Sequence, residues 1–144
     1  EDGRHSVSAE VPEAVLREAQ LLPFEAAVRE ARVMAVMTGY NRLNGTYCSE
    51  HPWLLRDVLR GEWGFDGLVM SDWYGSHSTR ASIRAGLDLE MPQREGMCYG
   101  SQLEDYVKRG LVGRQEVRER ARAVLGVMER LGLLQPDYAK PLAP

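Results

Sequence analysis

Short apolar runs without a helical period alternate along this chain with longer segments in which apolar residues recur every three or four positions. The runs cover residues 33–38 and 67–71, and a weaker one covers 85–91, where Asp88 and Glu90 interrupt the apolar pattern. Runs of this length are typical of strands that are buried on both faces of a parallel sheet. The pattern therefore predicts three strands.

The segments between these runs have helical periodicity. They cover residues 12–31, 52–60, 78–84, 102–109 and 114–131. In the first segment the periodicity puts Val15, Ala19 and Leu22 on one face, and Pro23 is expected to kink the helix or split it in two. The predicted order is helix, strand, helix, strand, helix, strand, helix, helix, which indicates parallel βα units.

Three strands are too few for a closed barrel, because a (β/α)8 barrel typically takes ~250 residues. The chain has 144 residues, so we expect an α/β fold that forms about the last three βα units of a partial (β/α)8 barrel of the TIM type. Residues 1–134 would form this unit. Residues 135–144 contain Pro136, Pro141 and Pro144 and are interpreted as a linker or tail.

Composition narrows the classes of partner. The net charge of −3 gives no reason to expect nucleic acid or an anionic membrane as a partner, and no apolar stretch approaches the ~20 residues of a membrane span. The chain starts at Glu1, which points to a processing, cloning or fragment boundary, so the compartment (cytoplasmic or secreted) stays open. Cys48 and Cys98 neither demand nor exclude a disulfide.

The strand predicted at 67–71 ends in Asp72 and Trp73, a carboxylate followed by an indole. Parallel folds of this kind place their chemistry at the carboxyl ends of strands, and neighbouring ends face one pocket. Tyr40 follows the preceding strand and could donate its hydroxyl to a substrate or to Asp72, although a buried tyrosine with one satisfied hydrogen bond is at least as common. A carboxylate beside flat rings suits a sugar, although Asp72 could also be a helix cap or an ion-pair partner.

A glycosidase generally needs a second carboxyl group. Asp88 and Glu90 share one face of the weak third strand, so either is a candidate for the partner acid, but we favour a helix-capping or loop-fixing role for them. The histidines have no spacing that makes a metal site, and there is no phosphate-cradling glycine loop, so neither a metal nor another cofactor is expected.

Several long motifs, in order along the chain, closely resemble family 3 glycoside hydrolases. They are Met-Thr-Gly-Tyr-Asn-Arg-Leu-Asn-Gly at 37–45, Cys-Ser-Glu-His-Pro-Trp-Leu-Leu at 48–55, Leu-Arg-Gly-Glu-Trp-Gly-Phe-Asp-Gly at 59–67, Ser-Asp-Trp at 71–73 and Ala-Gly-Leu-Asp-Leu-Glu-Met-Pro at 85–92. The resemblance covers nearly the whole chain.

The resemblance implies a retaining β-glycosidase that works by double displacement. It makes Asp72 the nucleophile, and it puts Met37, Tyr40 and Trp73 around the −1 sugar. The tryptophan at position 73 resembles the β-glucosidase branch, whose members release β-D-glucose from non-reducing ends. Substrates would be small β-glucosides or short oligosaccharides.

The family's remaining site residues are not in this chain. Its sugar-binding Lys-His pair and a sugar-binding Asp lie upstream, and its acid/base Glu comes from a second domain after the linker. We therefore expect the C-terminal portion of the catalytic domain, inactive by itself, whose partners are the rest of that domain and the second domain. The alternative is a non-catalytic carbohydrate-binding or interaction domain derived from a truncated glycosidase.

Overall fold

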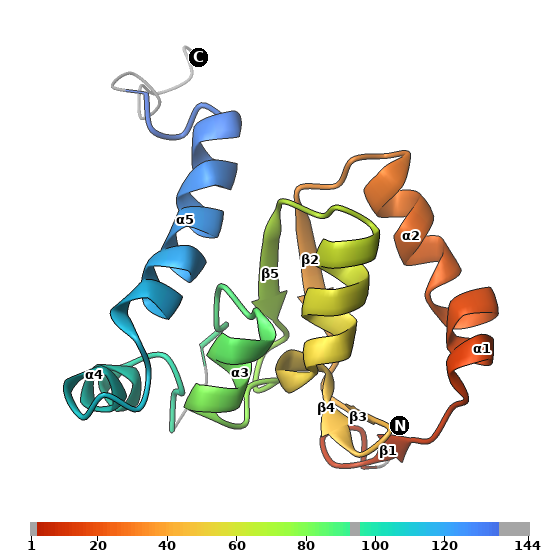
Figure 1. Cartoon of the computed structure of the whole chain (residues 1–144), viewed down its shortest axis with the longest axis horizontal. Coiled ribbons are helices and arrows are strands. Elements are labelled where there is room, and N and C mark those ends of the chain that lie inside the picture. The colour runs from red at the N-terminus through yellow and green to blue at the C-terminus, as the bar shows by residue number, and fades with distance from the viewer. Residues whose placement is uncertain (1–2, 93–95, 136–144) are drawn as a thin grey trace, which may run out of the picture.

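The computed structural model describes residues 3–92 and 96–135, which form an α/β structure around a central pair of parallel strands (Figure 1). The elements in chain order are β1 (Ser8–Ala9), α1 (Glu13–Val15), η1 (Leu16–Gln20), α2 (Leu22–Arg29), β2 (Ala35–Thr38), β3 (Arg42–Leu43), β4 (Thr46–Tyr47), η2 (Cys48–Glu50), η3 (Trp53–Glu62), β5 (Leu68–Ser71), α3 (Thr79–Ala85), α4 (Ser101–Lys108) and α5 (Arg114–Arg130). In the view of Figure 1, α1 and α2 lie to one side of β2 and β5, and α4 and α5 lie to the other.

The central pair confirms the strands predicted at 33–38 and 67–71. β2 and β5 run parallel, with Ala35 opposite Leu68 and Thr38 opposite Ser71. β5 is buried as expected, but Met37 on β2 is 55% exposed, so one face of that strand is open. β1, β3 and β4 form a second small sheet, in which β1 and β3 are parallel and β3 and β4 are antiparallel.

The third strand expected at 85–91 is wrong in its extent. α3 continues to Ala85, Gly86 follows in the left-handed conformation with φ +111°, and of this segment only Leu89 forms a bridge, to Met70. The polar side chain of Asp88 explains the difference. Its Oδ2 accepts the Val69 backbone N–H at 2.8 Å, so a carboxylate takes the place of a strand carbonyl.

The first predicted helix is split, as its proline suggested, into α1 with η1 and then α2, with Pro23 in the first turn of α2. Its buried face differs from the expected one: Leu16, Leu21 and Val28 are buried, whereas Val15 and Leu22 are about half exposed. The winding of η1 accounts for this, because Leu21 N–H donates to Leu16 O, five residues back. That wider turn shifts the residues that follow it around the axis.

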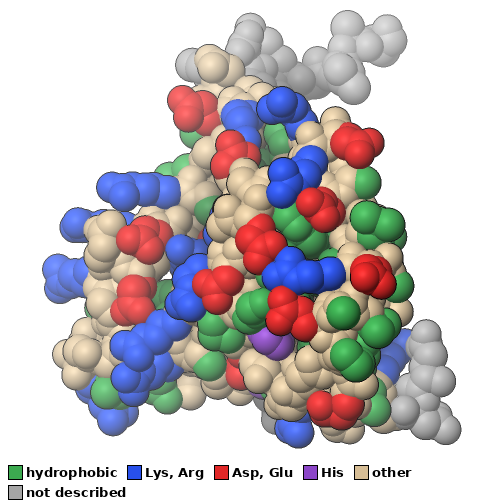
Figure 2. Space-filling model, turned by 45° about the vertical axis from the view of Figure 1, so that its right-hand side comes forward, with side chains coloured by type: hydrophobic (Ala, Val, Ile, Leu, Met, Phe, Trp, Pro, Cys, Tyr) green, Lys and Arg blue, Asp and Glu red, His purple; other side chains and the backbone are tan. Residues whose placement is uncertain are grey.

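The hydrophobic core lies between η3, β5 and the segment that follows α3. Val58, Val69, Ala85 and Leu87 are fully buried within it. Acidic and basic side chains are interspersed on the molecular face in Figure 2, and one ion pair on the surface joins Arg17 of η1 to Glu62 of η3. In the described part of the chain, no helix is both long and apolar enough to cross a bilayer.

Gly67, just before β5, provides a test of this packing. A Cβ at this position would lie 2.4 Å from Met34 O, so Gly67→Ala forces two backbone segments apart. We expect a loss of about 1–3 kcal/mol in the free energy of unfolding. Gly126→Ala is the control, because a Cβ there meets nothing within 4 Å on α5, and it should stabilise by about 0.5–1 kcal/mol. Denaturation of both variants checks this, and equal effects would contradict it.

Candidate active site

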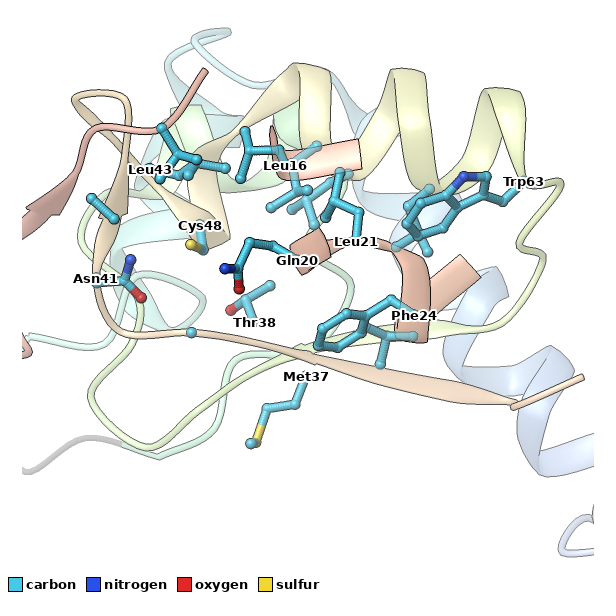
Figure 3. Close-up of a pocket in the computed structure, with 17 residues that line it drawn as sticks. Leu16, Gln20, Leu21, Phe24, Met37, Thr38, Asn41, Leu43, Cys48 and Trp63 are labelled. Carbon is cyan, nitrogen blue, oxygen red and sulfur yellow. The ribbon is translucent and has the colours of Figure 1, made fainter. Parts of the chain in front are cut away.

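The candidate site lies where β2 and β5 end. Because Thr38 pairs with Ser71 in parallel register, Tyr40 and Asp72 leave neighbouring strands at the same edge of the sheet. Met37 and Thr38 point to opposite sides of β2 (Figure 3). The structure thus brings Tyr40 and Asp72 to the same edge, as the sequence predicted. Met37 lies within β2, three residues before Tyr40, and is exposed on the open face of that strand.

Tyr40 and Asp72 lie close enough to interact. Hydrogen bonding to the Asp72 carboxylate is the main cause that raises the pKa of the Tyr40 hydroxyl above its ordinary value. Two side chains from the N-terminal segment flank the Tyr40 ring: the His5 ring is 4.5 Å away, centroid to centroid, and the Arg4 guanidinium is 5.5 Å from the ring centroid. The N-terminal segment thus packs against the Tyr40 ring.

A tight turn follows Asp72 and fixes its carboxylate. The Trp73 backbone N–H donates to Asp72 Oδ1 at 2.7 Å, and Gly75 N–H donates to Asp72 O at 3.0 Å. The fully buried Ser49 donates its Oγ hydrogen to Gly75 O at 2.7 Å, which ties the turn to η2. Trp73 remains 50% exposed, so its ring is free to meet a ligand beside the carboxylate.

Sequence reasoning missed the aromatic support behind Tyr40. His77 stacks on the Tyr47 ring with a centroid distance of 3.5 Å, and the Arg42 guanidinium lies 4.5 Å from the same ring. His77 also hydrogen-bonds the Tyr40 backbone, and its pKa is lowered, chiefly by burial. The position of His77 in the loop after Asp72 was the sequence feature that could have indicated its contact with this part of the site.

Asp88 and Glu90, the other carboxylates near these strand ends, have structural partners. Asp88 binds Arg60 and Arg120 as well as the Val69 N–H, and Glu90 accepts the backbone N–H groups of residues 98 and 99 at 2.9 and 2.6 Å. These contacts agree with the favoured loop-fixing interpretation. Asp72, by contrast, is only partly buried.

Within residues 3–92 and 96–135, no group of three or more His, Cys, Asp or Glu side chains is arranged to hold a metal ion. Both cysteines are free thiols, and burial raises the pKa of Cys48 and brings that of Cys98 to about 12.

A cavity of about 420 Å³ lies beside β2, bordered by η1, α2 and η3, and Met37 is one of its lining residues. Figure 3 shows Leu16, Leu21, Phe24 and Trp63 around it, and Thr38 points into it. Its lining is mostly apolar and does not include Asp72. We therefore place the candidate site at the strand ends and not in this cavity.

Comparison with known proteins identifies the family. Residues 1–127 match the model of the glycosyl hydrolase family 3 N-terminal domain. The chain belongs to glycosyl hydrolase family 3. This corrects the expectation of a C-terminal portion, because the match assigns the chain to the N-terminal region of such proteins. The same match confirms the resemblance to family 3 glycoside hydrolases that the sequence motifs indicated.

Several relatives of this family 3 chain are named β-glucosidases. A β-glucosidase of Rhizobium radiobacter is 54% identical over 139 residues, which are 95% of this chain and 17% of that protein. β-Glucosidase B of Emericella nidulans is 46% identical over 132 residues, 92% of this chain and 16% of that protein. The chain thus spans about a sixth of the length of these curated relatives.

Solved structures of the family resemble the fold closely. The family 3 β-glucosidase of Bifidobacterium adolescentis aligns with a TM-score of 0.82 at 35% identity, over 96% of this chain and 20% of that one. β-Glucosidase 3B of Thermotoga neapolitana, in complex with glucose, aligns with a TM-score of 0.83 at 40% identity, over 87% of this chain and 18% of that one.

The Tyr40–Asp72 contact leads to a prediction for the complete protein. Tyr40→Phe removes a donor to a charged acceptor, so kcat/KM on an aryl β-glucoside should fall roughly ten- to a hundredfold while Tm stays near the wild-type value. Because the pKa of Tyr40 is raised, the contact is present at neutral pH and is lost only as pH rises through that pKa. Tyr106→Phe on α4 is the matched control. Normal kinetics with a reduced Tm would instead give Tyr40 a purely structural role.

Proposed function

We propose that this chain is part of the catalytic domain of a retaining β-glucosidase, with Asp72 as the nucleophile and Met37, Tyr40 and Trp73 around the sugar. The observation that carries the proposal is the Asp72 carboxylate at the end of β5, hydrogen-bonded by Tyr40 from the end of β2 and followed by the half-exposed ring of Trp73. The β-glucosidases among the relatives, one of them bound to glucose, support this substrate class.

The proposed chemistry uses two displacements. The Asp72 carboxylate attacks the anomeric carbon, the bond to the leaving oxygen breaks, and that oxygen takes a proton from a general acid. Water then attacks the glycosyl–Asp72 ester, and the acid, now a base, removes the proton from this water, which releases glucose and the free carboxylate. Tyr40 keeps its proton at neutral pH and orients the carboxylate. The acid/base is proposed to come from another part of the complete protein.

The proposal includes a partial (β/α)8 barrel. Two features favour further strands beside these: Leu89, which is bridged to β5, exposes apolar surface, and an apolar cavity lies beside β2. A neighbouring strand from the complete protein would cover such surfaces. The assignment of residues 1–134 to the domain belongs to this proposal, and the linker at 135–144 falls almost wholly outside the described residues.

The isolated chain is proposed to have little or no activity, because protonation of the leaving group is commonly worth ~10²–10⁴-fold and its donor would be missing. An aryl β-glucoside whose leaving group needs no proton gives the fairest assay. Robust turnover by the purified monomeric chain, abolished by Asp72→Ala, would overturn this part of the proposal.

The complete protein provides the test of function. It should hydrolyse aryl β-glucosides in preference to other aryl glycosides, and ¹H NMR should detect β-glucose as the first-formed anomer. Initial release of α-glucose would contradict a retaining mechanism. No hydrolysis of any β-glycoside, with glucose binding preserved, would favour the carbohydrate-binding alternative.

A further inference from the structure

Tyr74 has a backbone conformation that is unfavourable for a bulky residue. Its φ is +61°, in the left-handed region, which among the described non-glycine residues is shared by Arg32 and Asn44. Asparagine tolerates this region in turns, whereas a large aromatic residue is strained there. Such strain persists only where the surroundings fix the backbone, and it is concentrated at functional sites.

The neighbours of Tyr74 fix its conformation. Gly75 N–H closes the turn onto Asp72 O, and the buried Ser49 hydroxyl holds Gly75 O from η2. Position 75 is tightly constrained as well, since a Cβ on Gly75 would lie 3.0 Å from Asp72 O. The turn that presents Asp72 therefore requires a left-handed residue at position 74, for which glycine is the unstrained choice.

The tyrosine ring at this position does not belong to the core. Tyr74 is 43% exposed and stands next to the half-exposed ring of Trp73. It is also near Asp72 in the chain: Tyr74 lies two residues after it, within the turn that the Gly75 N–H closes onto Asp72 O. The Tyr74 ring is exposed, its backbone conformation is strained, and it lies near Asp72 in the chain. It is therefore better suited to bind a ligand than to stabilise the fold.

Its place along the chain suggests which part of the ligand it meets. Asp72 is the first residue after β5, and Tyr40 contacts it from the end of β2, so the reacting sugar sits at the strand ends. Trp73 and Tyr74 follow Asp72 in the turn and are more exposed than Tyr40. A β-glucoside bound with its reacting sugar at Asp72 extends its other group toward solvent, past these two rings.

We propose that Tyr74 binds the leaving group of the glycoside, a second sugar or an aryl group, by stacking, and so sets the preference of the site for that group. This inference rests on the proposed β-glucosidase function. Stacking needs a ring face and not a hydroxyl, so phenylalanine at this position should serve nearly as well as tyrosine.

The experiment compares Tyr74→Gly, Tyr74→Phe and the wild type in the complete enzyme on methyl β-D-glucoside, phenyl β-D-glucoside and cellobiose. For Tyr74→Gly, kcat/KM should fall roughly tenfold on phenyl glucoside and cellobiose, mainly through KM, and by less than about twofold on methyl glucoside. Tyr74→Phe should stay within about twofold of wild type on all three.

A strain control separates the fold from the site. Arg32→Gly relieves the same kind of strain at an exposed position, so it should match Tyr74→Gly in keeping or raising Tm but leave the substrate preference unchanged. An equal loss on all three glucosides, no loss on any, or a lower Tm for Tyr74→Gly would overturn the assignment of Tyr74. A wild-type enzyme that hydrolyses none of them would instead refute the β-glucosidase function itself.

Discussion

Asp72→Ala in the complete protein should lower kcat on an aryl β-glucoside on the order of 10³-fold or more, equivalent to ~4 kcal/mol of barrier. The expectation follows from its position. The carboxylate sits at the end of β5, where its Oδ1 accepts the Trp73 N–H and where it interacts with the Tyr40 hydroxyl. Alanine removes the nucleophile and leaves the strand that carries it intact.

Two measurements distinguish a nucleophile from a merely supporting carboxylate. A 2-deoxy-2-fluoro β-glucoside should trap a covalent adduct that peptide mapping assigns to Asp72. Added azide should restore turnover to Asp72→Ala by taking the place of the missing carboxylate, with an α-glucosyl azide as product. Asp66→Ala is the matched control, because Asp66 precedes β5 and is 83% exposed in its ion pair with Arg130. A label on another residue would remove Asp72 from this role.

The sequence predicted the central strands because an apolar run of four to six residues has few alternatives in a small α/β fold. It also predicted that Tyr40 and Asp72 would approach, since the carboxyl ends of neighbouring parallel strands meet at one edge. The structure has both features. The sequence could therefore predict those features of the site that follow from the order and direction of the strands.

The remaining differences come from side chains that replace or redirect backbone hydrogen bonds. The Asp88 carboxylate accepts the Val69 N–H, which limits the third strand to a single bridge. The periodicity of the sequence cannot reveal a hydrogen bond of this kind between distant residues. The contact between Ser49 and Gly75 joins residues 26 positions apart, and it sets the turn that presents Asp72. The conformation of Tyr74 follows from these contacts and is equally invisible in the pattern.

Asp88 is expected to be the most sensitive position for stability. Its side chain is 0% exposed and accepts hydrogen bonds from Arg60 at 2.5 Å, Arg120 at 3.1 Å and the Val69 N–H, so it joins η3, α5 and β5. Burial raises the pKa of Asp88, and the guanidiniums act in the opposite direction. Asp88→Ala removes the shared acceptor and leaves two largely buried guanidiniums close together, which should cost about 3–5 kcal/mol of unfolding free energy.

The comparison that tests this role is between Asp88 and Asp66, which both pair with arginine but differ in burial. Asp66→Ala breaks an exposed pair and should change stability little, because such pairs are solvated and screened. Asp88→Asn retains an acceptor oxygen but not the charge, so it should fall between Asp88→Ala and the wild type. Chemical denaturation of the three variants in the complete protein measures the differences. If Asp88→Ala is no worse than Asp66→Ala, the buried bridge is not what holds α5 to the sheet. If the expected order is found, the favoured role of Asp88 as a fixing residue and not a catalytic acid is strengthened.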